Sequence, residues 1–313
     1  MRRPDQTGLP LAWGTWGEAD ELGTLNNITL DSTAAAARLV RRGVRFNLNL
    51  PLHVPLGVIG EGAHRLRKGP VQTLFKGTFA GLQVRDDKID DLYLQASTQW
   101  DGLAHIDDPI QGFYNGVRDG EITQAEGTRL GIEHYVNFGI ATRGVLVDLP
   151  RYYRAQGRQW SPVGSQVASA EDIVDALATC HLQLRPGDIL AVRTGWVTAF
   201  RAARDDQERD LLFRQRDYSG LSGGVHTWEL LWDSRVAAVA SDSVTVESWP
   251  ISERAPSLHL AIARLGVVLG EMFDLDLLAA DCAETGVYEF FCVSAPLNVR
   301  GGIGSPANAL AIK

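Results

Sequence analysis

One stretch of the sequence brings an imidazole and several carboxylates together and ends at a proline: Gln99-Trp100-Asp101-Gly102-Leu103-Ala104-His105-Ile106-Asp107-Asp108-Pro109. In an extended strand alternate residues share a face, so His105 and Asp107 could bind one cation together. Asp101 would lie roughly 13 Å from His105 in a straight strand, and it joins them only if the chain bends at Gly102. A helix fits less well, because Pro109 disfavours helix immediately before it. His-x-Asp alone supplies too few ligands to hold a cation tightly, so distant residues decide the interpretation.

The composition is that of an ordinary globular protein. The chain has 313 residues, 45% of them hydrophobic and 22% charged, and is long enough to bury a large core. A formal net charge of -8 and a pI near 5.4 argue against nucleic acid or an anionic membrane as a partner. Cys180, Cys282 and Cys292 show no CxxC spacing, so we expect neither a disulfide framework nor a thiolate zinc site. With no apolar leader and no apolar run of about 18 residues, we expect a cytoplasmic protein.

Strand and helix patterns alternate along the chain. Strands are predicted over 44–50, 144–148, 188–193, 236–240 and 288–293. Helices are predicted over 34–40, with Asp31 or Ser32 as the cap, from Ser169 to Ala178, and over 225–232. The glycine-rich run 301–306 is typical of a loop, and 205–224 is either a long excursion such as a lid or plain surface. The interleaved elements predict a single α/β domain over 1–313, built on a mixed central sheet.

The histidines outside the opening stretch are few enough to compare one by one. Four of them, His53, His64, His134 and His181, have no acidic partner at metal-ligand spacing and favour core or surface roles. His226 stands at the start of a predicted helix, where it could cap the helix or face a cavity. His259 precedes an apolar segment that ends at Glu271. Since a carboxylate after such a segment is costly to bury unless it is paired or bound to a cation, His259 and Glu271 are candidate ligands.

These residues resemble the cyclase-like metal-dependent hydrolases, a family that includes bacterial kynurenine formamidase and isatin hydrolase. The family hallmark is His-x-Gly-Thr-His-x-Asp-x-Pro-x-His, and residues 101–111 keep its second His, its Asp and its Pro as His105, Asp107 and Pro109. The family's downstream His and Glu ligands, twelve residues apart, correspond to His259 and Glu271. Segments 192–195, 274–277, 295–298 and 302–306 are also similar, so the resemblance spans most of the chain.

The opening stretch also departs from the hallmark. Asp101 stands where the family has a ligand His, and this oxygen ligand favours manganese over zinc. Gln111 stands where the family has a His used in proton transfer, and an amide cannot act as a general base. Leu103 and Ala104 replace the hallmark Gly and Thr. The chain is therefore identified as a divergent branch of this family.

The resemblance implies a fold, a metal site and a reaction. The fold is of the swivelling β/β/α type, with a mixed, partly barrel-like central sheet flanked by helices. The site would hold one or two Mn²⁺ or Zn²⁺ ions through five ligands, Asp101, His105, Asp107, His259 and Glu271. The implied reaction is metal-assisted hydrolysis of an amide-type C–N bond, in a cyclic amide or an N-formyl amide, by activated water.

Two further roles complete the expected site. With Gln111 in place of the family His, elimination leaves His226 or a ligand carboxylate, Glu271 included, as the general base. The aromatic residues expected to line an apolar substrate pocket are Trp100, Phe113, Tyr114 and Trp196.

Two alternatives stay open at this point. The same metal site could serve a lactonase or a cyclase, and Ala104 with Gln111 would also suit a binding protein that has lost catalysis. For partners we expect a small-molecule substrate, neither nucleic acid nor membrane, and, by analogy with the family, a homo-oligomer such as a dimer or tetramer.

Overall fold

The computed structural model describes residues 8–54, 67, 69–251 and 256–313. The strands are β1 Arg45–Asn47, β2 Val71–Phe79, β3 Leu82–Asp90, β4 Gln99–Asp101, β5 Ile140–Asp148, β6 Val167–Ala168, β7 Ile189–Arg193, β8 Gly220–Leu221, β9 Ala238–Ser241, β10 Val268–Glu271, β11 Glu289–Ser294, β12 Gly304–Pro306 and β13 Ala309–Ile312. The α-helices are α1 Leu30–Ala37, α2 Glu133–Phe138, α3 Leu149–Ala155, α4 Ala170–Thr179, α5 Trp196–Ala202, α6 Asp206–Arg214, α7 Val225–Asp233, α8 Leu260–Leu265 and α9 Asp276–Thr285. Short 3-10 turns lie at Gly23–Asn27, Tyr114–Gly116 and Asp119–Glu121.

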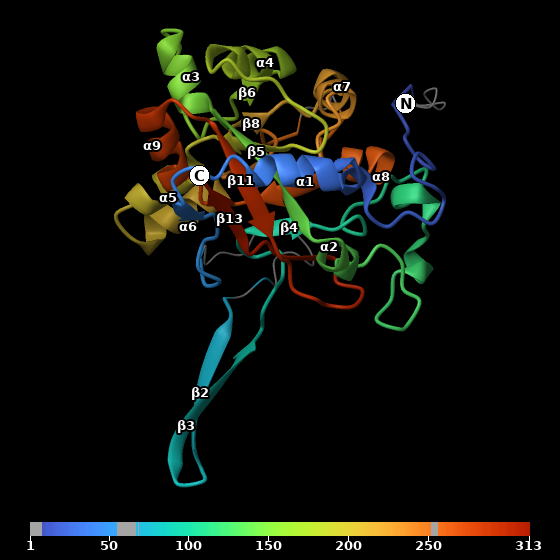
Figure 1. Cartoon of the computed structure of the whole chain (residues 1–313), viewed down its shortest axis with the longest axis vertical. Helices are drawn as coiled ribbons and strands as arrows, with labels where there is room; N and C mark the ends of the chain where they lie inside the picture. Colours follow the sequence, from blue (N-terminus) through green and yellow to red (C-terminus); the bar gives the residue numbers. More distant parts are fainter. Residues whose placement is uncertain (1–7, 55–66, 68, 252–255) are drawn as a thin grey trace.

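Nine strands form one mixed, curled sheet, in the order β1-β13-β11-β5-β7-β9-β10-β4-β12 (Figure 1). Its centre, β5-β7-β9-β10, is parallel, and the strands on both flanks are antiparallel. The parallel strands read as apolar runs because helices connect them and cover the sheet. This arrangement confirms the expected α/β class with a mixed, partly barrel-like sheet.

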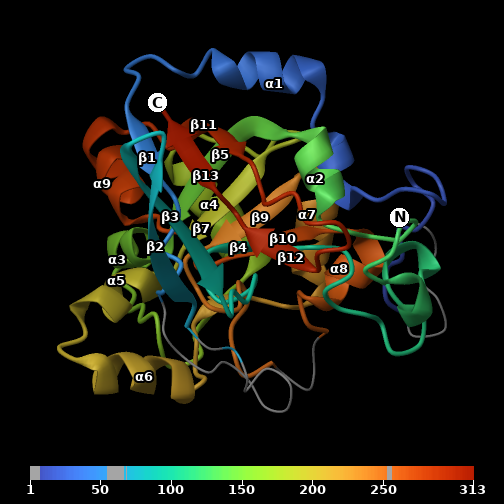
Figure 2. The same cartoon turned by 90° about the horizontal axis from the view of Figure 1, so that it is seen from below.

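Helices lie against the sheet on both of its faces. The helix α1 crosses β5 and β11 on one face, as Figure 2 shows, while α3 and α4 pack near β5 from their positions between β5 and β7 in the chain. Ser169 caps α4, because its side chain accepts from the Asp172 backbone and the Asp172 side chain accepts in return. No helix in the described part of the chain combines the length and apolar character needed to cross a membrane.

Several predicted elements lie where expected, and others are corrected. The strands β5, β7, β9 and β11 and the helices α4 and α7 confirm the predicted pattern. The first helix begins earlier than predicted, because Thr29 rather than Asp31 or Ser32 forms its capping box. The expected strand over 44–50 shortens to β1. The expected loop 301–306 contains β12, which pairs with β4, and the segment 205–224 contains α6 and β8.

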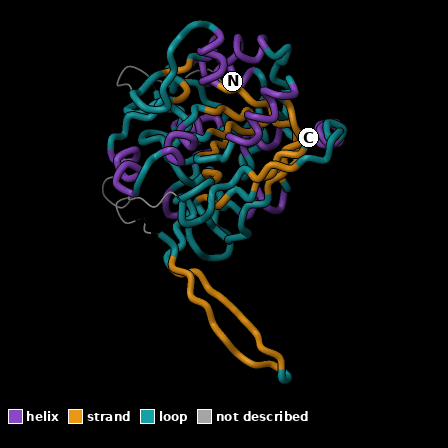
Figure 3. Tube along the Cα trace, turned by 90° about the vertical axis from the view of Figure 1, so that its left-hand side faces the viewer, coloured by secondary structure: helices purple, strands orange, loops and turns teal. Residues whose placement is uncertain are grey.

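The hairpin β2–β3 is a feature that the sequence did not predict. Its nine register pairs run from Val71 opposite Asp90 to Phe79 opposite Leu82. The hairpin projects away from the main body of the molecule, as Figures 1 and 3 show from two directions.

Candidate metal centre

Two adjacent strands bring the first site residues together. In the antiparallel pair β4–β10, Glu271 lies directly opposite Gln99, so the two side chains share a face of the sheet. Asp101 lies two residues beyond Gln99 and therefore points to the same face. The Gln99 Nε2 donates to Glu271 Oε2 at 2.6 Å and lies 3.3 Å from Asp101 Oδ1. Register thus places two carboxylates, more than 150 residues apart in sequence, at one edge of the site.

His259 completes a three-ligand cluster with these carboxylates. It directly precedes α8, which leads into β10. Its Nε2 lies 3.1 Å from Glu271 Oε1 and 4.0 Å from Asp101 Oδ2, and one donor atom from each of the three residues lies within 4.8 Å of the others. Donor atoms that bind one ion tetrahedrally at about 2.1 Å lie roughly 3.4 Å apart. The spacing of the cluster therefore fits a single divalent cation.

The Asp101 carboxylate provides the clearest test of that fit. Asp101 is fully buried, and among the described residues its Oδ2 has no hydrogen-bond partner. Burial raises its pKa well above the ordinary value and the Glu271 carboxylate raises it further, while His259 and Arg67 lower it. A buried carboxylate oxygen without a donor is costly unless a cation binds it. The orphaned oxygen lies 4.0 Å from His259 Nε2, where a cation held by Asp101, His259 and Glu271 would satisfy it.

Glu247 orients His259 and was missed by the sequence analysis. Its Oε1 accepts from His259 Nδ1 at 2.7 Å and from Ser257 Oγ at 2.6 Å, and its Oε2 accepts from the Leu258 backbone at 2.8 Å. This contact leaves the His259 Nε2 facing the cluster, the arrangement by which a second carboxylate fixes the ring of a metal-binding histidine. A signal was present: Glu247 is the one charged residue between Asp242 and Glu253, and it is buried.

Protonation of this pair follows from its contacts. Burial alone would lower the pKa of His259, but hydrogen bonds with Glu247 and Glu271 outweigh burial and raise it. Burial favours the neutral form of Glu247, yet the hydrogen bond and charge of His259 hold the pKa of that carboxyl below its ordinary value. The two groups therefore form an ion pair while no cation competes for the ring.

A turn after β4 carries His105 back toward the cluster. The Gly102 backbone donates to Ile303 at 2.9 Å, and a Cβ at Gly102 would lie 2.6 Å from that same oxygen, so only glycine permits this close approach. The His105 Nε2 consequently lies 3.8 Å from Asp101 Oδ1. The bend at Gly102 that the sequence analysis required is present, and it brings His105 and Asp101 together.

Asp107 lies outside this arrangement. Its side chain is exposed, and it is absent from the three-residue cluster found among the described residues. The neighbouring Asp108 is the buried acid of this turn, paired with the fully buried Arg264 and accepting from the Ile110 and Gln111 backbones. The structure therefore does not bring Asp107 into the cluster of Asp101, His259 and Glu271.

A pocket of about 590 Å³ opens onto the cluster. Its lining combines His105, His259 and Glu271 with apolar side chains and two arginines, Arg67 and Arg216. The apolar part of the lining consists of Ile106, Pro109, Tyr218, Val244, Trp249, Ile251 and Leu260.

The four aromatic residues predicted for this lining lie elsewhere. Trp100 is fully buried, donates to Ser294 Oγ and packs edge-on against Phe273. Tyr114 is buried with its hydroxyl on Asp20, and Phe113 packs against the main core. Trp196 is buried in a second apolar cluster with Phe200 and Phe213. Core packing, the competing role for large aromatic residues, accounts for all four placements.

His226 also lies away from the pocket. Its side chain is 85% exposed in the first turn of α7, and its Nδ1 lies 3.5 Å from Glu229, one turn further along the helix. The structure therefore places His226, one of the residues expected as general base, on the surface of α7 and does not bring it into the pocket lining.

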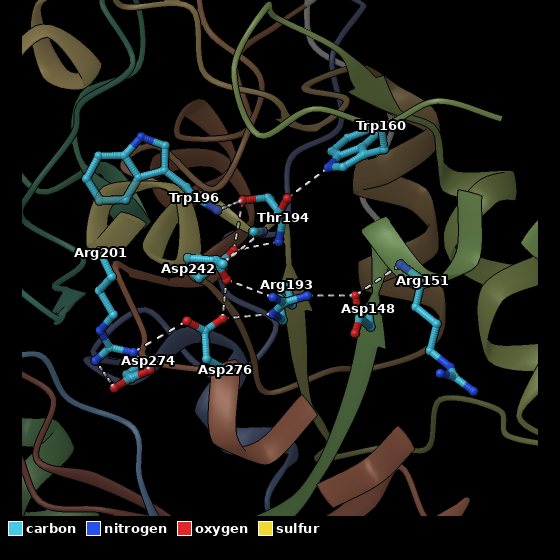
Figure 4. Close-up of polar contacts among 12 residues, drawn as sticks. Asp148, Arg151, Trp160, Arg193, Thr194, Trp196, Arg201, Asp242, Asp274 and Asp276 are labelled. Carbon is cyan, nitrogen blue, oxygen red and sulfur yellow. Dashed lines mark hydrogen bonds and ion pairs between the residues drawn. The ribbon is translucent and has the colours of Figure 1, made fainter. Parts of the chain in front are cut away.

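A second buried carboxylate, Asp242, lies at the end of β9 and has a different environment. It accepts from the Thr194 backbone at 2.5 Å, the Thr194 hydroxyl at 2.8 Å and the Gly195 backbone at 2.9 Å. Nearby, Arg193 bridges Asp148 and Asp276, as Figure 4 shows. Burial raises the pKa of Asp242 to about 6, against these hydrogen bonds and the charge of Arg193. The segment 192–195, one of those that resemble the family, thus ties β7 to β9.

The fold and the cluster define an α/β protein with a buried centre of two carboxylates and one imidazole. Comparison with known proteins agrees with this fold. The family model described as "Putative cyclase" matches residues 54–248. The crystal structure of a novel cyclase is 35% identical to this chain with a TM-score of 0.84, and the match covers 97% of this chain and 100% of that one. The chain belongs to the cyclase family, as its motifs predicted.

More distant structures share the fold. Isatin hydrolase A from Ralstonia solanacearum is 15% identical with a TM-score of 0.57, over 91% of this chain and 98% of that one. An isatin hydrolase bound to the product analogue thioisatinate is 16% identical with a TM-score of 0.55, over the same shares. No curated protein sequence matches the chain.

Proposed function

We propose that this protein is a metal-dependent hydrolase that cleaves an amide-type C–N bond, in a cyclic amide or an N-formyl amide of a small organic substrate. The observation that carries the proposal is the buried Asp101 Oδ2, which has no hydrogen-bond partner among the described residues and faces His259. Membership of the cyclase family, whose distant structural relatives include isatin hydrolases, supports the same reaction class.

Asp101, His259 and Glu271 would hold the ion, with His105 as a further donor at the edge of the cluster. Two of the three clustered ligands are carboxylates, which favours Mn²⁺, while the imidazole also suits Zn²⁺. The proposal assigns one ion to this cluster, since its three donor atoms lie within 4.8 Å of one another. A bound divalent ion supplies Lewis-acid polarisation of a carbonyl and lowers the pKa of water to about 7.

Glu271 is the base in this proposal. Its Oε2 is fixed by Gln99, its Oε1 faces His259, and the residue lines the pocket. A carboxylate in this position can accept a proton from the attacking water and return it to the leaving nitrogen. Glu247 keeps the His259 ring in one orientation throughout, since it holds Nδ1.

The pocket suggests a small substrate with a ring and an electron-rich group. Its volume of about 590 Å³ lies within the range of small-molecule sites, and most of its lining is apolar. Arg67 and Arg216 place two guanidinium groups in the same lining, where they can bind a carboxylate or the negative charge that develops on a carbonyl oxygen.

Metal analysis and a substrate panel test the proposal together. Purified protein should contain about one equivalent of manganese or zinc per chain, and it should hydrolyse cyclic amides or N-formyl amides faster than lactones. Preference for lactones would replace the amidase with a lactonase on the same site. Metal without turnover of any amide or lactone would favour a binding protein, as Gln111 in place of the family His suggests. Protein that binds no divalent metal would exclude every one of these enzymes.

We also propose that the protein is cytoplasmic. Its support is that all three cysteines are unpaired and that two of them are buried as small apolar residues, as in a reducing compartment.

A further inference from the structure

The two arginines that line the pocket of the candidate metal centre have different surroundings. Arg67 donates from Nη1 to the Gln95 carbonyl at 2.6 Å, and its charge lowers the pKa of Asp101. Arg216 forms neither a side-chain hydrogen bond nor an ion pair within the described part of the chain. Its charge acts instead on Tyr218, where it opposes the burial that raises the pKa of that hydroxyl. One arginine therefore acts on the cluster, and the other lies beside Tyr218 in the pocket wall.

The lack of an acidic partner sets Arg216 apart from other covered arginines of this protein. Arg143 pairs with Asp188 at 2.6 Å, and Arg193 pairs with Asp148 at 3.1 Å. Arg216 is half-buried as well, but no acid among the residues that the structure describes accepts from its guanidinium. A guanidinium that loses part of its hydration is stabilised by an anion that accepts its N–H groups. Arg216 is thus suited to bind an anion from outside the chain.

The backbone around Arg216 is fixed in a conformation that residues other than glycine rarely adopt. Arg216 has a φ of 48°, in the left-handed region, and such a residue persists there only where its surroundings enforce it. The Asp217 carbonyl accepts from the Gly164 backbone at 2.7 Å, and the Tyr218 carbonyl accepts from the Trp249 backbone at 2.8 Å. These bonds hold the segment against two other loops, so the place of Arg216 in the pocket lining does not depend on a ligand.

The charges around the pocket leave Arg216 in excess once an ion is bound. A metal-bound imidazole is neutral. Three carboxylates then lie at the ion or at its imidazole ligand: Asp101, Glu247 and Glu271. A divalent ion together with Arg67 balances these three negative charges. Asp217, the neighbour of Arg216 in the chain, does not line the pocket. The pocket with its ion therefore matches a substrate that carries one negative charge.

We propose that Arg216 binds a carboxylate of the substrate, and that the substrate is a ring-bearing amide whose carboxylate lies away from the bond that is cleaved. This inference rests on the proposed function and names its substrate class. A guanidinium can bind a carboxylate through two parallel hydrogen bonds. Apolar residues of the same lining, among them Ile106, Val244 and Leu260, would pack against the ring. Arg67, which acts on Asp101, is left for the negative charge that develops on the reacting carbonyl.

The test compares two substrates of the same shape that differ in charge. 4-Formamidobenzoate has a carboxylate across the ring from its formamide, and 4-formamidobenzamide has a neutral carboxamide in that place. Formate release by the metal-loaded protein measures kcat/KM for each compound. The value should be about 10- to 100-fold higher for the carboxylate, because hydrogen bonds between charged groups contribute an effect of this size.

Four variants locate the source of this preference. Arg216→Gln removes the charge but keeps a long side chain, and it should reduce the preference to less than about 3-fold. Arg216→Lys keeps the charge and should retain part of the preference. Arg67→Gln should lower kcat for both compounds alike and leave the preference in place. Arg204→Gln is the matched control and should behave as wild type, because that side chain is 85% exposed and pairs with Glu208 outside the pocket.

Binding gives a readout that does not need turnover. In 4-acetylbenzoate and 4-acetylbenzamide a methyl ketone replaces the formamide, and calorimetry should show at least about 10-fold tighter binding of the carboxylate by wild type but not by Arg216→Gln. If this preference appears without formate release, the proposed reaction fails and the anion site stands. Equal kcat/KM for the two formamides, or a preference that survives Arg216→Gln, would overturn the anion site and leave the hydrolase in place. Unchanged metal content of Arg216→Gln shows that the variant folds.

Discussion

Two fully buried carboxylates lie at the ends of strands of the same sheet, Asp101 as the last residue of β4 and Asp242 directly after β9, and they have opposite environments. Asp242 receives three short hydrogen bonds from Thr194 and Gly195 and lies near Arg193 (Figure 4). Asp101 has one long contact with Gln99, a like charge nearby in Glu271, and an oxygen with no partner among the described residues. The protein itself therefore supplies hydrogen-bond donors to the Asp242 carboxylate but few to the Asp101 carboxylate.

The contrast separates a structural acid from a ligand. Burial removes water from both groups, and protein donors replace it only at Asp242. At Asp101 a divalent cation would compensate the buried negative charge. His259 and Glu271 lie close enough to bind the same cation. The predictions below test whether this contrast reflects metal binding, in order of the effect that we expect.

Removing the imidazole of the cluster should have the largest effect. In His259→Ala the cation loses one of three clustered ligands, so its dissociation constant should rise about 1,000-fold, or about 4 kcal/mol. Titration with Mn²⁺ and Zn²⁺, followed by calorimetry, measures this change. His226→Ala is the matched control, because that imidazole is exposed on α7 and should leave both metal affinity and turnover unchanged. Equal losses in the two variants would remove the cluster from the proposal.

Truncation of the two buried acids should affect stability unequally. Asp242→Ala leaves two backbone N–H groups and one hydroxyl without their acceptor, which should lower the free energy of unfolding by about 3–5 kcal/mol. Asp101→Ala removes a carboxylate that has few donors and a like charge beside it, so metal-free protein should lose less than half as much. Urea unfolding of the metal-free proteins compares them. A larger loss at Asp101 would contradict the contrast drawn above.

The pH dependence of stability gives a third measure of Asp242. Its pKa is about 6 in the folded protein, above the ordinary 3.8, so the folded state holds this proton more tightly. The associated stability is present below about pH 3.8 and is lost as the pH rises through about 6, which amounts to at most about 3 kcal/mol. The difference in unfolding free energy between wild type and Asp242→Ala should therefore shrink between pH 4 and pH 7. A constant difference would show that burial does not perturb this group.

Much of the fold could be predicted from local pattern. The strands β5 and β7 are continuous apolar runs, and the Ser169 capping box marks where α4 begins. The hairpin β2–β3 escaped prediction because its charged residues interrupt the alternation that a half-buried strand shows. β12 escaped because Gly304-Ser305-Pro306 has the chemistry of a loop, and only its pairing with β4 makes it a strand.

Motif spacing predicted the candidate metal ligands but not the residues that support them. Asp101, His105, His259 and Glu271 were proposed together, and the structure brings them together. Asp107 was proposed from an extended geometry that the turn at Gly102 replaces. Gln99 and Glu247 acquire their roles through partners far away in sequence or across a loop, which no local pattern encodes.

The smallest predicted effect concerns the carboxylate behind His259. Glu247→Gln keeps the size of the side chain but removes the charge that holds Nδ1, and its amide would present a donor to Ser257 or to the Leu258 backbone. Loss of such a supporting carboxylate should weaken metal binding about 10- to 100-fold, which is about 1.4–2.7 kcal/mol. Glu229→Gln is the matched control, because Glu229 also lies beside a histidine, His226, but on the exposed face of α7. If Glu247→Gln bound metal as tightly as Glu229→Gln, the buried His259–Glu247 pair would serve only the packing of the loop before α8, as the hydrogen bonds of Asp242 serve the joining of β7 to β9.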